Sequence, residues 1–316
     1  MKFFSKYAEE VDIVFRECKA IINKYPDGIR ELGLACIDKL DPSKVKEGNY
    51  ITYMLPFWLK EPFGMDGDVI KKLSMANVFK MLCASIQDKV IDSLNPEKYI
   101  KFLPLGNLFF IEFYKIYQEI LPGDSVFWGY LERYFHDWAV SIEFEKNSIN
   151  SGGTDLSDAD LSVLAKKAAP IKLSACAVCL LSGNETRISN LDEQINYALI
   201  TLQLVDDWVD KYKDFEDKCY TPVLGEIMRF ASVEKLELLE RSHINDAAYF
   251  SGIPNKIYEI SLKHRKNIAQ LMEIHIPDLV NFHEVLIGEI ETIVRRTESK
   301  KGEILQGGLY NFLNNK

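Results

Sequence analysis

The sequence has no apolar stretch long enough to cross a membrane. A membrane-spanning helix needs roughly 18 uninterrupted apolar residues, and a long apolar stretch such as residues 163–181 is interrupted by three lysines. The N-terminus lacks the apolar core of a signal peptide, because it turns acidic at Glu9 and Glu10. We therefore expect a soluble cytoplasmic protein without stable membrane insertion.

Positive charge is scarce. The chain has 38 Lys and Arg against 47 Asp and Glu, a net charge of −9. No stripe of basic residues interleaves with aromatic residues, which excludes a nucleic-acid surface. The five histidines are scattered and indicate neither a catalytic triad nor a metal site. If this acidic protein handles an anionic substrate, a cation must lie between the two.

Cysteines are few and form no disulfide pattern. Six cysteines in a chain without a secretion signal are expected to stay reduced. Cys176 and Cys179 have the spacing of a redox or zinc half-site, but they lie in the apolar run 173–181 and there is no second pair. We therefore predict that both pack in the core as small hydrophobic side chains.

Hydrophobic residues make up 47% of the chain and aromatic residues 12%, enough for a large core. They recur at intervals of three and four residues, which is the spacing of one helix face. The clearest such stripes are at residues 11–21, 79–90, 195–205 and 279–293. Breaks rich in Gly and Pro lie at residues 25–28, 62–64, 104–106, 122–124 and 150–153.

We therefore predict an all-α fold in which residues 1–316 form a single domain of ten or more helices, because no repeat, low-complexity tract or linker divides the chain. Ser157 and Asp160 have the spacing of a capping box. This pattern predicts a helical stretch that starts there and runs towards Leu181.

The most informative segment is the acidic run at residues 202–214. Residues four apart on a helix share a face, so Asp206, Asp210 and Asp214 form one stripe, with Asp207 beside it. Like charges at this spacing repel each other unless a cation neutralises them. The acidic run therefore points to a bound cation.

An ordinary solvated helix face is the alternative explanation of these acids. Lys211 can pair with Asp207 across one helical turn, as it would on a surface helix. No basic residue lies four positions from Asp206 or Asp210, however, and these two acids extend an apolar stripe. This favours a functional acidic stripe.

A second acid pair, Asp88 and Asp92, also lies four residues apart and follows an uncharged stripe. Alone, such a pair is most often a surface feature. Two facing helices that project carboxylates inward, however, form a metal site of the kind that helical bundles build. Oxygen ligands without His or Cys favour Mg²⁺, which substrate phosphates complete. We predict that the two acidic helices face each other across a cavity.

Several motifs resemble those of one superfamily. Residues 203–210, Q-L-V-D-D-W-V-D, are similar to the second aspartate-rich motif of prenyl synthases, Q-x-x-D-D-x-x-D. Extended to Asp214, the same run resembles the cyclase motif N-D-x-x-S-x-x-x-E. Asp88 and Asp92 resemble the D-x-x-x-D form of the first motif, with Gln87 where other families have another aspartate.

Two further segments carry the same resemblance. Residues 167–171 resemble the K-T-A-x-L segment of prenyl synthases, with Ala168 for threonine. Arg295 and Arg296 lie near the place where many cyclases have a pair that grips diphosphate. Over roughly residues 48–300, the chain resembles the class I isoprenoid synthase superfamily, which includes trans-prenyl diphosphate synthases, terpene cyclases and squalene/phytoene synthases.

The resemblance implies a large helical bundle with a central cavity, and it implies roles for the matching residues. The Mg²⁺ ligands would be Asp88 and Asp92 on one side, and Asp206, Asp207, Asp210 and Asp214 on the other. The groups that bind and stabilise the diphosphate leaving group would be Arg295, Arg296 and Lys167, with Lys166 or Lys172 as alternatives to Lys167.

One departure bears on the reaction. Elongating prenyl synthases bind a second, homoallylic diphosphate through a basic G-G-K-x-x-R-P segment, whereas the comparable residues 48–58 contain no Lys or Arg. Lys44, Lys46 and Lys60 flank this segment without matching the spacing of the motif. The favoured interpretation is therefore a terpene cyclase, a lyase that ionises one linear allylic prenyl diphosphate and releases a terpene hydrocarbon or alcohol.

Two alternatives stay open. One is an enzyme of the same fold, either a trans-prenyl diphosphate synthase or a head-to-head prenyltransferase of the squalene/phytoene type. The other is a non-catalytic helical subunit, although such a subunit has no reason to keep a repelling acidic stripe. The expected partner is a prenyl diphosphate substrate, and the sequence leaves a homodimer and the substrate chain length open.

Overall fold

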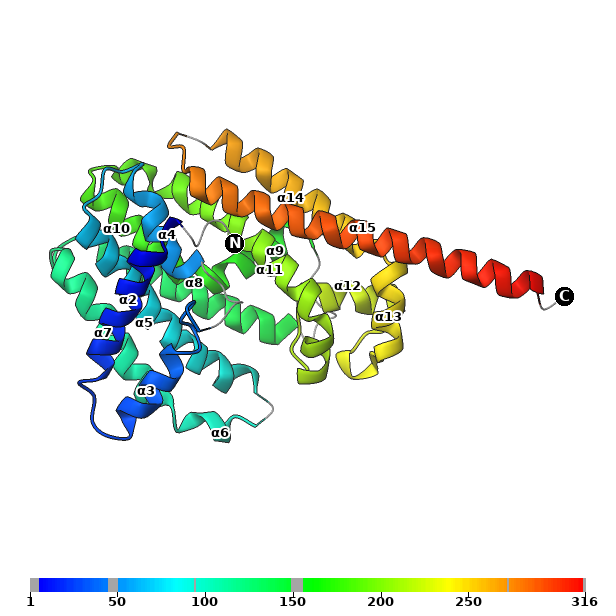
Figure 1. Ribbon diagram of the computed structural model, residues 1–316, viewed down its shortest axis with the longest axis horizontal. Helices are drawn as coiled ribbons and strands as arrows, with labels where there is room; N and C mark the ends of the chain where they lie inside the picture. The colour runs from blue at the N-terminus through cyan, green and yellow to red at the C-terminus, as the bar shows by residue number, and fades with distance from the viewer. Residues whose placement is uncertain (1–5, 45–50, 94, 149–155, 272, 315–316) are drawn as a thin grey trace. The chain divides into compact units, whose positions relative to one another are not determined.

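The computed structural model describes residues 6–44, 51–93, 95–148, 156–271 and 273–314. These residues form 14 α-helices, α2 to α15, and three short 3-10 helices, without a β-strand among them (Figure 1). The prediction of an all-α fold is confirmed.

The chain divides into two compact units. Unit 1 comprises Met1–Phe135, Pro170–Asp192 and Glu273–Leu279, and unit 2 comprises His136–Ala169, Glu193–Met272 and Val280–Lys316. The prediction of a single domain stays a prediction.

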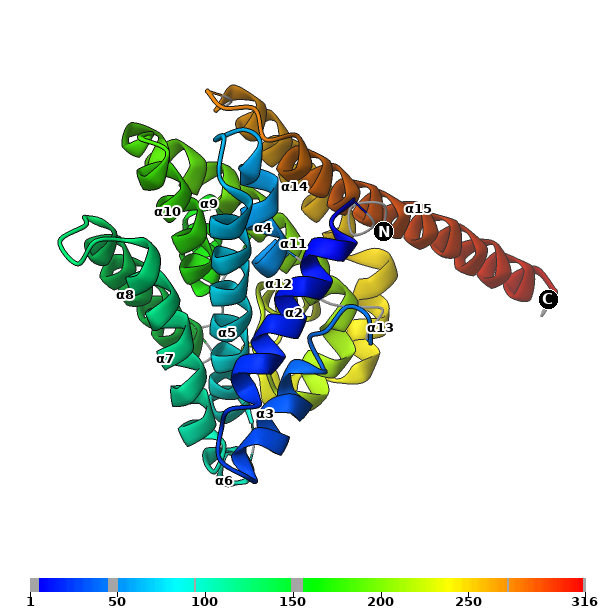
Figure 2. The same cartoon turned by 60° about the vertical axis from the view of Figure 1, so that its left-hand side comes forward.

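Unit 1 is built around α5 (Gly67–Asp92), which packs against α7 (Leu103–Ile120), α4 (Ile51–Lys60) and α2 (Ala8–Ile22). Figure 2 shows α5 between α7 and α2. The start of α5 is fixed by Asp66, whose carboxylate accepts hydrogen bonds from the backbone N–H groups of Asp68 (2.8 Å) and Val69 (3.3 Å). The helix ends at Asp92, so the first acid pair occupies its final turns.

The other elements of unit 1 are short. They are α3 (Ile29–Ile37), α6 (Glu97–Ile100), α10 (Leu173–Leu181) and the 3-10 helix η2 (Glu185–Arg187). The break predicted at residues 104–106 is wrong, because Pro104 lies in the first turn of α7. A proline is tolerated there, since its missing N–H would have no partner in that turn.

The thiols of α10 are part of the core of unit 1. Cys176 is 1% exposed and Cys179 is fully buried, and both are free. Burial raises the pKa of both thiols, that of Cys179 to about 12. A raised pKa keeps a thiol protonated at neutral pH, and a protonated thiol is a poor nucleophile and a poor metal ligand. The prediction of core packing is confirmed.

Unit 2 has one hydrophobic core, into which α11 (Ile188–Asp217) turns its apolar face. The surrounding helices are α12 (Pro222–Ala231), α13 (Arg241–Phe250), α14 (Ile253–Gln270) and α15 (Pro277–Asn314). The core side chains of α11 are Ile200, Leu204, Val205 and Trp208, which are between 1% and 7% exposed. Their burial sets the rotation of α11 and so determines which way the neighbouring acids point.

The first part of unit 2 contains α8 (Phe127–Ser148), α9 (Asp158–Ala165) and the 3-10 helix η1 (Lys166–Lys172); a third 3-10 helix, η3 (Leu236–Leu238), follows α12. As predicted, a helix begins after Ser157, whose hydroxyl accepts from the N–H of Asp160 at 3.4 Å. It does not continue unbroken to Leu181, because η1 intervenes. Pro170 explains this change, since it lacks an N–H and disfavours the α conformation of the residue before it.

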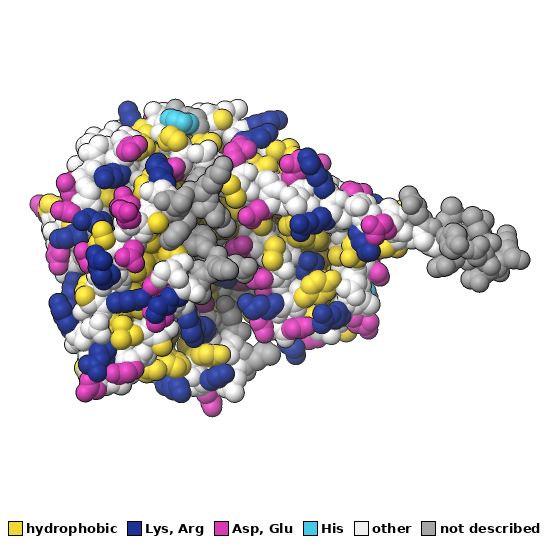
Figure 3. All heavy atoms as spheres, in the orientation of Figure 1, with side chains coloured by type: hydrophobic (Ala, Val, Ile, Leu, Met, Phe, Trp, Pro, Cys, Tyr) yellow, Lys and Arg dark blue, Asp and Glu magenta, His cyan; other side chains and the backbone are white. Residues whose placement is uncertain are grey.

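The surface carries both charges. Acidic and basic side chains are interspersed over the face shown in Figure 3. Among the described residues, no helix combines the length and the apolar character that crossing a bilayer requires.

Candidate active site

The acidic stripe lies on α11, as predicted. Asp206 and Asp210 are exposed, Asp214 is half-buried, and Asp207 is only 3% exposed. The same helix buries Trp208 in the core of unit 2. The sequence pattern thus produces one helix with an apolar side and a carboxylate side, as the periodicity requires.

The carboxylates of the stripe disfavour one another's charged form. Burial, followed by Asp210 and Glu289, raises the pKa of Asp206 to about 6. Burial, followed by Asp210, raises the pKa of Asp214 to about 7. Solvent reaches the exposed Asp206 and screens its charge, so burial acts more strongly on the half-buried Asp214. A cation bound along the stripe would relieve this repulsion and lower both pKa values.

Asp207 is the buried member of the group. Its Oδ1 accepts a hydrogen bond from Gln203 Nε2 at 2.6 Å, while its buried Oδ2 has no hydrogen-bond partner among the described residues. Burial, weakened by the Gln203 hydrogen bond, raises the pKa of Asp207 to about 8. Buried polar atoms almost always have a partner, so this oxygen is suited to a ligand that the protein chain does not supply.

The pair between Lys211 and Asp207 that a solvated helix face would allow is not formed. Lys211 is 9% exposed and turns towards the core, where its Nζ donates to the carbonyl oxygen of Trp208 at 2.9 Å. It lies 4.4 Å from the centre of the Trp208 ring, within the range of a cation–π contact. Among the described residues of its own helix, Asp207 therefore has no ion-pair partner.

Lys167 of η1 approaches the stripe from another element. Its Nζ lies 2.8 Å from Glu145 Oε2 and 3.0 Å from Glu145 Oε1, and Glu145 belongs to α8. After the larger effect of burial, Lys167 lowers the pKa of both Asp207 and Asp214. These four residues form what we call the acid–base cluster of unit 2.

Sequence reasoning missed Glu145. A signal exists in the sequence, because Asp137, Ser141 and Glu145 follow one another at four-residue intervals on α8. Both ends of this stripe pair with η1, since Lys166 Nζ also lies 3.1 Å from Asp137 Oδ1. The stripe thus anchors the 3-10 turn that carries Lys167.

The first acid pair belongs to unit 1. Asp88 is half-buried near the end of α5, whereas the side chain of Asp92 lies outside the described part of the structure. That this pair faces the acids of α11 across a cavity stays a prediction.

The donors fit magnesium by their chemistry, since all are carboxylate oxygens. No three Asp, Glu, His or Cys side chains in the described ranges gather closely enough to hold a metal by themselves. Magnesium does not require such a cage, because it commonly uses one or two carboxylates together with phosphate oxygens and water. The acidic stripe and the orphan oxygen of Asp207 supply donors of this kind.

Arg295 and Arg296 lie on the exposed surface of α15. Arg295 Nη2 lies 2.6 Å from Glu291 Oε1, one helical turn away, and its side chain is 76% exposed. Their role in binding diphosphate stays a prediction.

Solved structures share this arrangement of helices. A geranylgeranyl pyrophosphate synthetase from the archaeon Geoglobus acetivorans matches with a TM-score of 0.70 over 92% of this chain and 98% of its own, at 16% identity. The chain has the class I isoprenoid synthase fold. A polyprenyl synthase from Caulobacter crescentus, complexed with calcium and isoprenyl diphosphate, matches with a TM-score of 0.68 over 91% of this chain and 96% of its own, at 15% identity. Neither a family sequence model nor a curated protein sequence matches the chain.

Proposed function

We propose that this chain is a magnesium-dependent trans-prenyl diphosphate synthase. The observation that carries the proposal is the acidic stripe of α11 beside Lys167, where burial, followed by Asp210, raises the pKa of Asp206 and Asp214. Such a stripe is suited to a divalent cation that bridges an acidic protein to a diphosphate. The names of the two solved structures with this fold support elongation over cyclisation.

The reaction breaks the C1–O bond of an allylic diphosphate, and its electron pair leaves with diphosphate. The double bond of a homoallylic diphosphate then forms a carbon–carbon bond with the allylic cation and loses a proton. Magnesium, when bound, acts as a Lewis acid on the leaving oxygens. The ligands to it would be Asp88 and Asp92 on α5 and Asp206, Asp207, Asp210 and Asp214 on α11.

The basic groups have a separate task. Lys167 lies between Glu145 and the acids of α11. There it would donate hydrogen bonds to the diphosphate as negative charge grows on it. Gln203 would hold Asp207 in place through its 2.6 Å hydrogen bond. Arg295 and Arg296 would stabilise the departing diphosphate only if their side chains reach it from α15.

A terpene cyclase is the second candidate, and one observation favours it. Residues 48–58 contain no Lys or Arg. A chain without a cation for a second diphosphate would ionise one substrate and let the cation cyclise. The two candidates predict different products from the same substrates.

Product analysis by mass spectrometry separates these functions. With Mg²⁺, an allylic C10 or C15 diphosphate and the homoallylic C5 diphosphate, we expect a longer prenyl diphosphate that forms only when both substrates are present. A hydrocarbon or alcohol from the allylic substrate alone would replace this proposal with the cyclase. If no diphosphate is released under any condition, the chain is a non-catalytic subunit of this fold.

Lys167→Met should weaken binding of the allylic diphosphate. A charge-assisted hydrogen bond contributes about 1.5–3 kcal/mol, so we expect KM for the allylic substrate to rise at least about tenfold. Lys256→Met is the matched control, because Lys256 also pairs with a glutamate, Glu226, at 2.8 Å in unit 2. Equal effects of the two variants on KM would exclude a specific role of Lys167.

A further inference from the structure

The last turns of α15 leave the other helices of unit 2. Ile293 still packs against the core of the unit, and Asn255 Nδ2 of α14 donates to Glu298 Oε1 at 3.4 Å. From Lys300 onwards, no hydrogen bond or ion pair joins α15 to another helix among the residues that the structure describes. Figures 1 and 2 show the end of α15 extending past α12, α13 and α14 of the same unit.

This end of α15 carries exposed apolar residues. Ile304 is 40% exposed and Leu305 is 58% exposed. In the sequence, three more apolar residues follow Leu305 by four, seven and eight positions, which is the spacing of one helix face: Leu309, Phe312 and Leu313. Their side chains lie outside the described part of the structure, so their place on this face follows from the spacing. We call residues 304–313 the apolar end of α15.

Comparable apolar runs of the chain are enclosed. Residues 51–59 of α4 are all buried, and α10 is buried from Leu173 to Cys179. Single apolar residues on a surface are ordinary, but a series that forms one helix face marks a surface for a partner. The apolar end of α15 is therefore suited to docking.

The charge around the apolar end is opposite in sign to that of the chain. Residues 295–316 contain five Lys and Arg against two Glu, a net charge of +3, whereas the whole chain carries −9. Arg295 and Lys300 each pair with a glutamate one helical turn away. Arg296 and Lys301 make no ion pair with the residues that the structure describes. This charge favours an anionic partner.

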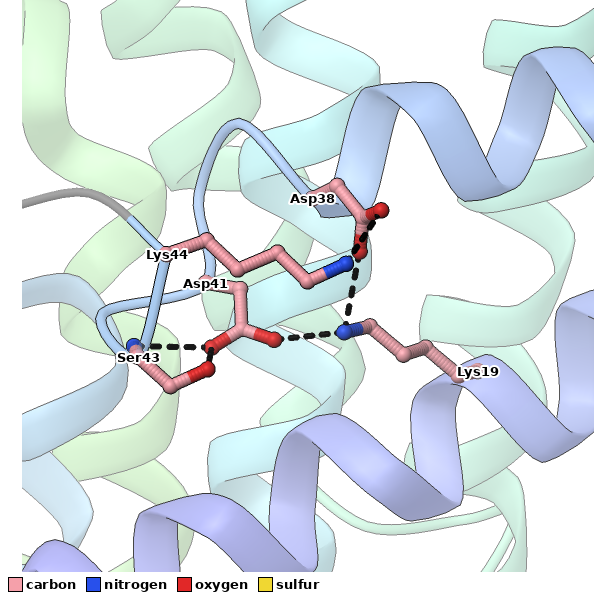
Figure 4. Close-up of polar contacts among 5 residues, drawn as sticks. All are labelled: Lys19, Asp38, Asp41, Ser43 and Lys44. Carbon is pink, nitrogen blue, oxygen red and sulfur yellow. Dashed lines mark hydrogen bonds and ion pairs between the residues drawn. The ribbon is translucent and has the colours of Figure 1, made fainter.

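The basic residues at the end of α2 and after α3 show the opposite arrangement. Lys19 pairs with Asp38 at 2.9 Å and with Asp41, and Lys44 pairs with Asp38 at 2.6 Å (Figure 4). Ser43 Oγ also donates to Asp41, at 2.6 Å. Two carboxylates thus neutralise two lysines in this cluster, which leaves no net charge to attract an anion. The excess of basic residues around the apolar end has no such compensation.

An anionic lipid surface matches both properties of this segment. A helix with an apolar face and basic residues lies in the plane of a bilayer interface, with its apolar side chains among the acyl chains and its basic side chains at the headgroups. A second copy of the same helix would instead bring like charges together, which opposes self-pairing.

We propose that the end of α15, residues 295–314, docks this protein on an anionic lipid bilayer. Docking needs no catalysis, so the proposal does not depend on the proposed function. It gives that function a place, however. An elongating enzyme on a bilayer would release its product, which has an apolar chain and a diphosphate head, beside the phase into which that product partitions.

Co-sedimentation with vesicles of phosphatidylcholine and phosphatidylserine, in a ratio of about three to one, measures this docking. The wild type should bind these vesicles. Leu305→Glu should bind them at least about tenfold more weakly, because it places a charge in the apolar face. Leu238→Glu is the matched control, since Leu238 is 59% exposed in the same unit but lies on η3. It should bind like the wild type.

A double variant tests the part of the charge. Lys300→Gln combined with Lys301→Gln should weaken binding by about tenfold, because each basic residue near an anionic surface adds to the attraction. Lys263→Gln combined with Lys266→Gln removes the same charge from α14 and should leave binding unchanged. Vesicles of phosphatidylcholine alone, or high salt, should weaken binding of the wild type in the same way.

These measurements are made in EDTA without substrate, so their outcome is separate from the test of the function. Failure of the wild type to bind, equal binding of Leu305→Glu and Leu238→Glu, or equal binding to vesicles without phosphatidylserine would overturn the proposal. If the wild type ignores vesicles and Leu305→Glu lowers the molar mass measured by light scattering, a second copy covers the apolar end instead. Should Leu305→Glu fail to fold, Leu305→Ser is compared with Leu238→Ser.

Discussion

Asp210→Ala should reduce magnesium-dependent diphosphate release by about 1,000-fold or more, since a metal that stabilises the leaving group contributes several kcal/mol. Asp206→Asn should act in the same direction. The melting temperature of both variants should be unchanged or higher, because each removes one of the like charges that repel along the stripe, and Asp210 contributes to the raised pKa of both Asp206 and Asp214. Loss of activity together with a gain in stability is the behaviour of a site built for a ligand.

The control for these variants is Glu193→Gln. Glu193 is an exposed acid on the same helix, outside the stripe. The Glu193→Gln variant should keep full activity. This result would show that the loss of activity in Asp210→Ala and Asp206→Asn does not arise from removing one negative charge from the chain. Diphosphate release is measured colorimetrically over a range of magnesium concentrations. Full activity of Asp210→Ala, or activity of the wild type in excess chelator, would contradict the metal site.

Acid should destabilise unit 2 through a buried pair of histidines. Thr201 Oγ1 lies 3.0 Å from His264 Nδ1 and 2.9 Å from His283 Nε2, and all three residues are at most 3% exposed. A hydroxyl has one proton, so it can donate to one ring and accept from the other, and the ring that accepts this proton must be neutral. Burial, followed by His264 and Arg265, lowers the pKa of His283 to about 4.

The direction of the pH dependence follows from this depressed pKa. The unfolded chain takes up the proton near pH 6.5, whereas the folded chain resists it until about pH 4. The contribution of neutral His283 to the free energy of unfolding is therefore fully present above pH 6.5. As the pH falls towards 4, the free energy of unfolding decreases by roughly 3 kcal/mol. Urea unfolding at a series of pH values measures this pH dependence as the slope of the free energy of unfolding against pH.

His283→Gln should make the free energy of unfolding depend less steeply on pH under acidic conditions, whatever the effect of the substitution on stability at neutral pH. The matched control is His275→Gln, because His275 is exposed. It should leave the slope as it is in the wild type. Equal slopes for the wild type and His283→Gln would show that the cluster around Thr201 does not take part in acid unfolding.

The helix of the acidic stripe could be predicted because its signal is local. Apolar residues at helical spacing continue into acids on one face, so sequence alone places Asp206, Asp210 and Asp214 together. The buried thiols of α10 were predictable for the same reason, since an uninterrupted apolar run leaves no polar side for a metal site.

Partners across the chain could not be predicted in this way. Lys167 pairs with Glu145, 22 residues away on another helix. The spacing of residues along one helix gives no information about such a pairing between two helices. The sequence allowed Lys211 to pair with Asp207 on a surface helix, but the rotation of α11 set by Trp208 turns Lys211 to the core. The interruption by η1 was missed because apolar spacing continues across it, although Pro170 was visible.

The burial of α4 limits how this protein can be redesigned. Grafting the basic segment of elongating enzymes onto residues 51–58 would place cations where every side chain is enclosed. Each unpaired buried ion costs several kcal/mol, against a total stability of about 5–15 kcal/mol for a typical domain. Directed evolution should therefore avoid residues 51–59 of α4, where most charged variants would be lost to misfolding before selection.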